Sequence, residues 1–190
     1  MKPITDDLIV REVLAGKKEA YAHVVDRYKK PLYNLAYRMT LSAEDALDLS
    51  QETFVRAYAR LHTYQPGKSL FAWLYTICLN LTRNHLGRKR EFPAESEDAL
   101  GRRTTEGGNC DPSPEELMTE REKIRSLEKG LQRLPVELRE AVVLRYMQEL
   151  PFEEVSRVLG ISLSATKMRV YRGLERLREV MHYKEMIHGL

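Results

Sequence analysis

Apolar residues recur at three- and four-residue steps through most of the chain, and no stretch alternates apolar and polar positions as a half-buried strand does. The clearest helical pattern lies between about residues 18 and 38. Its apolar positions are Tyr21, Val24, Val25, Tyr28, Leu32, Leu35, Ala36 and Met39. Pro31 lacks a backbone donor, so we expect a kink or break near Lys30. The pattern as a whole predicts an all-α protein.

The same periodicity predicts three more helices within the first 90 residues. One begins at Thr5 or Asp6, one follows a cap at Ser42, and one runs from Leu70 to about Arg90. Residues 64–69, which contain a Pro-Gly pair, separate the last two helices as a loop. These four helices can bury one shared core, so residues 1–90 are expected to form the first domain.

Residues 91–112 show no periodicity and contain two prolines and three glycines. A segment of this length without helices is implausible inside a compact domain, so we interpret it as a flexible linker. Ser113 and Pro114 then have the form of a helix start, with proline at the first helical position. Further helices are expected at about 114–133, 135–148, 152–159 and 163–182. The sequence therefore predicts two small helical domains, residues 1–90 and 113–190.

Charge is distributed unevenly along the chain, although the net charge is only +3. From Glu91 to Glu122 there are ten acidic and three basic residues, a local charge of −7, so the remaining 158 residues carry +10. The positive excess is concentrated in residues 83–90 and 167–178. This arrangement indicates two separate surfaces that face polyanions.

Composition excludes several classes of protein. Apolar residues make up 43% of the chain and charged residues 31%, which is typical of a globular protein. The longest apolar run, residues 70–75, is too short to span a membrane, and the N-terminus lacks the core of a signal peptide. Cys78 and Cys110 have no neighbours at metal-ligand spacing. We therefore expect a cytoplasmic protein without membrane insertion, metal or cofactor.

Residues 152–180 have the features of a helix-turn-helix. A short helix with apolar Val155 and Val158 is followed by Gly160, which permits the left-handed turn, and by Ser162, which caps the next helix. The outer side of that second helix carries Lys167, Met168, Arg169, Tyr171, Arg172 and Arg176. Basic residues spaced in this way suit a DNA major groove. A helical hairpin with a solvated charged face is the alternative interpretation.

The helix that begins at Leu70 combines aromatic, amide and cationic side chains. They are Trp73, Tyr75, Asn80, Arg83, Asn84 and His85. Aromatic rings beside cations are typical of single-stranded nucleic-acid binding, in which bases stack and phosphates are neutralised. Trp73 taken alone is better explained as a core residue, but asparagine is a poor residue inside a helix unless it forms a hydrogen bond.

Polar and acidic residues form a stripe on the preceding helix, at steps of three and four residues. The stripe consists of Asp45, Asp48, Gln51 and Glu52. Paired carboxylates can act as acid and base, but neither a glycine loop nor a nucleophile motif accompanies them, so no enzyme activity is expected. By itself the stripe is interpreted as a solvated face.

In combination these segments resemble a known family. Residues 45–58 and 71–85 look like the second conserved region of bacterial sigma factors, and residues 134–146 with the helix-turn-helix look like the fourth. The chain passes from one to the other without a third-region domain. That layout resembles the extracytoplasmic-function (ECF) group of the sigma-70 family, and the resemblance covers nearly all of the chain outside the linker.

The resemblance implies a role for each group of residues. Docking on the clamp coiled coil of the largest polymerase subunit is implied for Asp45, Asp48, Gln51 and Glu52. Melting and reading of the −10 promoter element, with a base held by the loop, is implied for Tyr64, Lys68, Trp73, Asn80, Arg83, Asn84 and Arg88. Reading of the −35 element is implied for Ser164, Lys167, Met168, Arg169, Tyr171, Arg172 and Arg176.

The implied partners are core RNA polymerase, through its clamp coiled coil and flap, promoter DNA, and an anti-sigma factor. We further hypothesise that the acidic linker mimics RNA in the exit channel. Met168 is bulky where relatives have small or polar residues, and Pro66-Gly67 makes the loop unusual, so base preferences do not transfer directly. A stand-alone helix-turn-helix regulator would bind its operator tightly without polymerase, and an adaptor module would lack salt-dependent DNA affinity.

Overall fold

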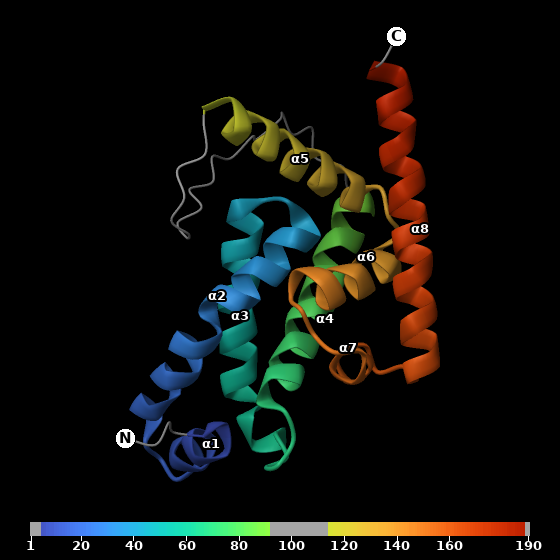
Figure 1. The fold of residues 1–190 in the computed structure, drawn as a ribbon. Helices are drawn as coiled ribbons and strands as arrows, with labels where there is room; N and C mark the ends of the chain where they lie inside the picture. The colour runs from blue at the N-terminus through green and yellow to red at the C-terminus, as the bar shows by residue number, and fades with distance from the viewer. Residues whose placement is uncertain (1–4, 92–113, 189–190) are drawn as a thin grey trace.

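A computed structural model describes residues 5–91 and 114–188, and every regular element within these ranges is helical (Figure 1). The all-α prediction is therefore confirmed for the described part of the chain. The acidic linker and the predicted capping residue Ser113 lie outside the described residues.

The N-terminal helices pack around one core, as the periodicity predicted. They are α1 (Asp6–Leu14), α2 (Tyr21–Thr40), α3 (Ala43–Ala59) and α4 (Leu70–Glu91). The predicted cap of α3 is present, because Ser42 Oγ accepts a hydrogen bond of 3.2 Å from the backbone N–H of Asp45. Leu32, Leu35 and Leu74 are fully buried between α2, α3 and α4, and their burial holds the three helices together.

Of the kink or break expected near Lys30, the break is not present, because α2 continues as a single helix from Tyr21 to Thr40. Proline removes one backbone hydrogen bond, but Tyr28 and Leu32 on either side of it are buried in the core. Tertiary packing of this face therefore outweighs the local penalty, and the helix continues past the proline.

The C-terminal helices are α5 (Pro114–Gln132), α6 (Val136–Val142), α7 (Phe152–Leu159) and α8 (Leu163–His188). The prediction of a single helix at about 135–148 is wrong in one respect. After α6 the chain forms a π-helical turn, Val143–Met147, in which the N–H of Gln148 bonds to the carbonyl of Val143 at 3.0 Å. This hydrogen bond joins residues i and i+5 instead of i and i+4, so the side chains that follow point in a different direction from those of a continued α-helix.

The two groups of helices contact one another, with α6 and α7 lying against α4 (Figure 1). Buried Arg139 donates to the carbonyl of Met39, at the end of α2, with a distance of 2.6 Å. Tyr75 Oη donates to Gln148 Oε1 at 2.9 Å, and Glu140 is fully buried at this contact. The sequence patterns gave no indication of this interface.

Candidate nucleic-acid interface

The turn between α7 and α8 has the geometry that its residues predicted. Gly160 ends α7 with a φ of 66°, in the left-handed region, and Ser162 Oγ accepts a 3.2 Å hydrogen bond from the N–H of Ala165. Val155 and Val170 are fully buried between the two helices. The helix-turn-helix is therefore fixed by its caps and its apolar side, which leaves the other side of α8 toward solvent.

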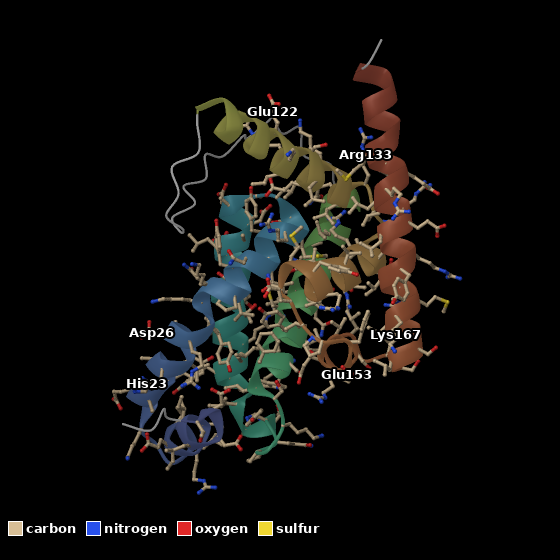
Figure 2. The ribbon with its side chains drawn as sticks, viewed as in Figure 1. His23, Asp26, Glu122, Arg133, Glu153 and Lys167 are labelled. Atoms are coloured by element: carbon tan, nitrogen blue, oxygen red, sulfur yellow. The ribbon has the colours of Figure 1, made fainter. Side chains whose placement is uncertain are left out.

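The exposed side of α8 presents most of the residues predicted to read DNA. Met168 is 49% exposed and Tyr171 59% exposed, and Lys167 and Arg172 are also exposed. Lys167 lies near the N-terminal end of α8 (Figure 2). Ser164 is exposed and Arg169 half-buried, whereas Arg176 pairs with Glu179 at 2.6 Å. Cations and amphipathic side chains thus share one accessible helix face.

Two residues that sequence reasoning missed adjoin this face. Lys167 Nζ lies 5.8 Å from the centre of the Phe152 ring, and the Arg145 guanidinium lies 5.1 Å from the same ring. The rings of Phe152 and Tyr171 are 6.4 Å apart. Cation–π contacts of this kind restrain long side chains near the surface. An aromatic residue at the start of α7 was the available signal in the sequence.

In the N-terminal half, Trp73 lies at the start of α4 against Tyr64 of the preceding loop. Their ring centres are 5.9 Å apart, Tyr64 is 6% exposed, and Trp73 is half-buried. Burial, together with a hydrogen bond to Asp7, raises the pKa of Tyr64 well above its usual value, so the phenol stays protonated. The loop residue Tyr64 therefore forms an ordered aromatic pair with Trp73, and Lys68 lies exposed on the same loop.

Arg83 is engaged by the C-terminal half of the molecule. Its Nε and Nη2 donate to the two carboxylate oxygens of Glu140 at 2.5 and 2.6 Å, and its Nη1 donates to Asn80 Oδ1 at 3.1 Å. The hydrogen bonds to Glu140 raise the pKa of the Arg83 guanidinium. Asn80 is exposed, so it is accessible while Arg83 is held in a bidentate ion pair.

The three carboxylates of the acidic stripe, but not Gln51, line one wall of a cleft of about 270 Å³ between α3 and α4. Asp48 and Gln51 are exposed, Glu52 pairs with Arg56 at 2.6 Å, and Asp45 Oδ1 lies 3.3 Å from His85 Nε2. The stripe is thus a partly paired surface whose outermost members remain accessible.

Asn84 and Arg88, predicted to contact DNA, line the opposite wall of this cleft. Along α4, Asn84 is about 16 Å from Trp73, at a rise of about 1.5 Å per residue. The structure therefore separates the residues predicted for the −10 element into three groups. One surrounds Trp73, the second is Asn80 with Arg83 beside Glu140, and the third lies opposite the carboxylates.

In the described part of the chain, no cluster of three or more His, Cys, Asp or Glu residues is placed to bind a metal ion. None of the helices in the same ranges is both long and apolar enough to cross a membrane.

Comparison with known protein families agrees with this arrangement. Residues 24–92 match the family described as sigma-70 region 2, and residues 124–177 match sigma-70 region 4. The first match spans α2, α3 and α4, and the second extends from α5 through most of α8. The helix α1 lies outside both.

Two relatives match this chain over nearly their whole length. The ECF RNA polymerase sigma factor SigW of Bacillus subtilis is 30% identical over 177 residues, which cover 90% of this chain and 93% of SigW. The ECF RNA polymerase sigma-E factor of Escherichia coli is 29% identical over 176 residues, covering 90% and 92%.

Two solved structures have the same fold. CnrH, in complex with the cytosolic domain of CnrY, superimposes with a TM-score of 0.69 at 24% identity, covering 94% of this chain and 97% of CnrH. RpoE of Bartonella quintana, in complex with the anti-sigma factor NepR, gives a TM-score of 0.66 at 23% identity, covering 85% and 96%. The chain belongs to the ECF group of the sigma-70 family, the transcription initiation factors that give RNA polymerase its promoter specificity.

Proposed function

We propose that this chain binds core RNA polymerase through the acidic wall of the α3–α4 cleft, reads a −35 element with α8, and opens the −10 element with α4 and residues 64–69. The observation that carries this proposal is the exposed set of Lys167, Met168, Tyr171 and Arg172 on a capped recognition helix. In this scheme residues 1–90 and 113–190 act as separate domains joined by the acidic linker.

Reading of the −35 element relies on side chains that already face solvent. Lys167 and Arg172 donate to guanine O6 and N7 in the major groove, while Met168 and Tyr171 pack on thymine methyl groups or sugars. Arg169, Arg176 and the hydroxyl of Ser164 contact phosphates, which fix the position of the helix without specifying sequence.

Opening of the −10 element relies on capture of a separated strand. Unpairing a base costs a few kcal/mol, and this cost is offset when the extruded base enters a pocket and its neighbours stack on aromatic rings. Half-buried Trp73, with buried Tyr64 packed behind it, supplies such a platform. Lys68 and Asn80 are accessible beside the strand, and Arg83 joins them once it leaves Glu140. Asn84 and Arg88 continue the cationic track along α4.

Docking on polymerase relies on the carboxylates of Asp45, Asp48 and Glu52, with the amide of Gln51. Carboxylates on one helix face suit the arginine-rich clamp coiled coil, because guanidinium and carboxylate pair in a planar, bidentate geometry. The C-terminal domain contacts the flap, and an anti-sigma factor occludes these surfaces in the cytoplasm. The complex of NepR with RpoE supports this last part of the proposal.

Run-off transcription with core polymerase and a promoter library tests the proposal. Sequencing of the transcripts is expected to recover a −10 and a −35 motif at a fixed spacing. The variant Asp48→Asn with Glu52→Gln is expected to lose about tenfold in affinity for core polymerase, while Glu44→Gln, on the first turn of the same helix, leaves it unchanged. Specific operator binding by the chain alone, with no start sites directed on core polymerase, would contradict the proposal and favour a stand-alone regulator.

A further inference from the structure

Asp7 connects α1 to the loop that precedes α4. Its Oδ2 accepts a hydrogen bond of 2.9 Å from the backbone N–H of Gly67, and its Oδ1 accepts one of 2.8 Å from Tyr64 Oη. In Figure 1, α1 lies beside this loop at the lower end of α3 and α4. One carboxylate thus bonds to two points of residues 64–69, across 60 residues of sequence.

The helix α1 is itself fixed to the rest of the N-terminal half. Its apolar side, which includes Ile9 and Val10, is fully buried. Next to Asp7, Asp6 accepts hydrogen bonds from Arg27 Nη1 and, at 2.6 Å, from Tyr28 Oη on α2. Two adjacent carboxylates therefore face in different directions, one toward α2 and the other toward the loop. The helix that carries Asp7 is therefore itself bonded to α2.

The rest of the loop is fixed by α4. Ser69 Oγ accepts a 3.1 Å hydrogen bond from the N–H of Ala72 and caps the helix, and the Tyr64 ring packs on Trp73. Tyr64 Oη also lies 2.5 Å from the carbonyl of Lys68. Between these points the chain turns at Gly67, where φ is +81°. The N–H of this left-handed residue is the group that Asp7 holds, so Asp7 fixes the tip of the turn.

We propose that Asp7 is a positioning residue for strand capture, and that α1 thereby takes part in promoter opening although it lies outside both family matches. This inference rests on the proposed function of residues 64–69 as the loop that holds an extruded base. A base pocket formed by loop backbone binds tightly only when the loop is already ordered, because otherwise binding must also order it. Asp7 supplies that order without touching the DNA.

The test uses holoenzyme and promoters in which single non-template bases of the −10 element are replaced by abasic sites. We expect one position at which base removal slows open-complex formation by wild-type holoenzyme about tenfold, as loss of a captured base should. Asp7→Ala is expected to slow opening of the intact promoter about fivefold. Removal of the captured base should then slow opening by the Asp7→Ala holoenzyme little further, because the protein variant and the abasic site remove the same interaction. The control Glu12→Ala removes a carboxylate from the same helix that pairs with exposed Lys17 at 3.0 Å, away from the loop, and should behave as wild type.

The variant Asp7→Asn distinguishes a positioning role of Asp7 from a simple folding defect. Asparagine keeps an acceptor for the N–H of Gly67 but loses the charge, so an intermediate opening rate is expected with an unchanged melting temperature. If Asp7→Ala retains the full tenfold dependence on the captured base, Asp7 has no positioning role. If wild-type holoenzyme shows no sensitive position at all, the base-holding loop itself is wrong, and the role of Asp7 is overturned with it.

Discussion

The two candidate DNA surfaces are built differently. On α8, Met168 and Tyr171 are exposed on a helix whose caps and buried side fix its direction. Around α4, Tyr64 is buried and Trp73 packs against it, with hydrogen bonds that order the loop. A duplex major groove is present before binding, so exposed side chains suffice to read it. A separated strand is not present before binding, so the protein must supply an ordered platform for it.

The largest expected effect on transcription comes from replacing the exposed cations of α8. Each bidentate contact to a base is worth about 1–3 kcal/mol, so Lys167→Ala combined with Arg172→Ala should reduce transcription from a −35-dependent promoter about a hundredfold. Measurement on a set of promoters with altered −35 elements should show that discrimination between them is lost. Binding to core polymerase, measured in parallel, should stay unchanged.

Arg176→Ala is the matched control for this double variant. Because Arg176 is assigned to a phosphate, its loss should weaken all promoters by a similar few-fold factor. If the double variant also lowered all promoters equally, the reading role of the exposed face would be contradicted.

The helices that carry the two surfaces also differ in how tightly they are packed. A Cβ at Gly173 of α8 would lie 2.5 Å from Val142 Cγ2 and 3.2 Å from the carbonyl of Leu138, whereas a Cβ at Gly87 of α4 would meet no atom within 4 Å. Gly173→Ala should therefore lower the free energy of unfolding by about 1–3 kcal/mol through overpacking.

Gly87→Ala should instead raise the free energy of unfolding by up to about 1 kcal/mol, because alanine favours the helix. Denaturant titration of both variants checks the pair. Equal effects at the two positions would show that the close approach of α6 to α8 is not rigid in solution.

A smaller effect is expected at the contact between the two halves. Arg83→Gln leaves the fully buried carboxylate of Glu140 without its paired cation, so the population in which the halves are separated should rise about tenfold. Glu140→Gln removes the buried charge itself, and the 37% exposed Arg83 side chain returns to water, so a rise of about twofold to threefold is expected.

Energy transfer between dyes at positions 30 and 175, with Cys110 replaced by serine, reports this separation. Glu153→Gln is the control, because it removes an exposed charge on α7, away from Arg83, and should leave the transfer efficiency unchanged. If Arg83→Gln had no more effect than this control, the ion pair would not hold the halves together.

The smallest expected effect is confined to the N-terminal half and depends on pH. Burial raises the pKa of Cys78 from 9.0 to about 11, so the neutral thiol stabilises the fold below about pH 9, and this contribution is lost as the pH rises toward 11. Between about pH 8 and pH 9.5 the free energy of unfolding should fall by roughly 0.8 kcal/mol more in the wild type than in Cys78→Ala. Parallel pH profiles of the two proteins would contradict this assignment.

Local features of the fold were predictable from the sequence. Apolar periodicity located the helices, and Ser42 and Gly160 marked a helix start and a helix end that the structure confirms. These signals work because capping and left-handed turns depend on a few adjacent residues. Pro31 does not break α2, since its local penalty is outweighed by the burial of the residues around it.

Contacts between distant residues were not predictable in the same way. Arg83 and Glu140 are 57 residues apart, and Asp7 and Gly67 are 60 residues apart. Periodicity shows which face of a helix is buried, but not which face of another helix it meets. Charge patterning therefore identified Arg83 as a cation on a basic segment, whereas only the packed structure shows the carboxylate that it binds.

The ion pair of Arg83 and Glu140 affects how salt should act on strand capture. A cation that moves from water onto a phosphate displaces a counterion, which makes binding weaker as ionic strength rises. Arg83 instead exchanges one anion for another, and the carboxylate that it leaves attracts a dissolved cation in its place. The arginine that joins the −10 contacts last should therefore add almost nothing to the steepness of the salt dependence, even though it contributes to the affinity.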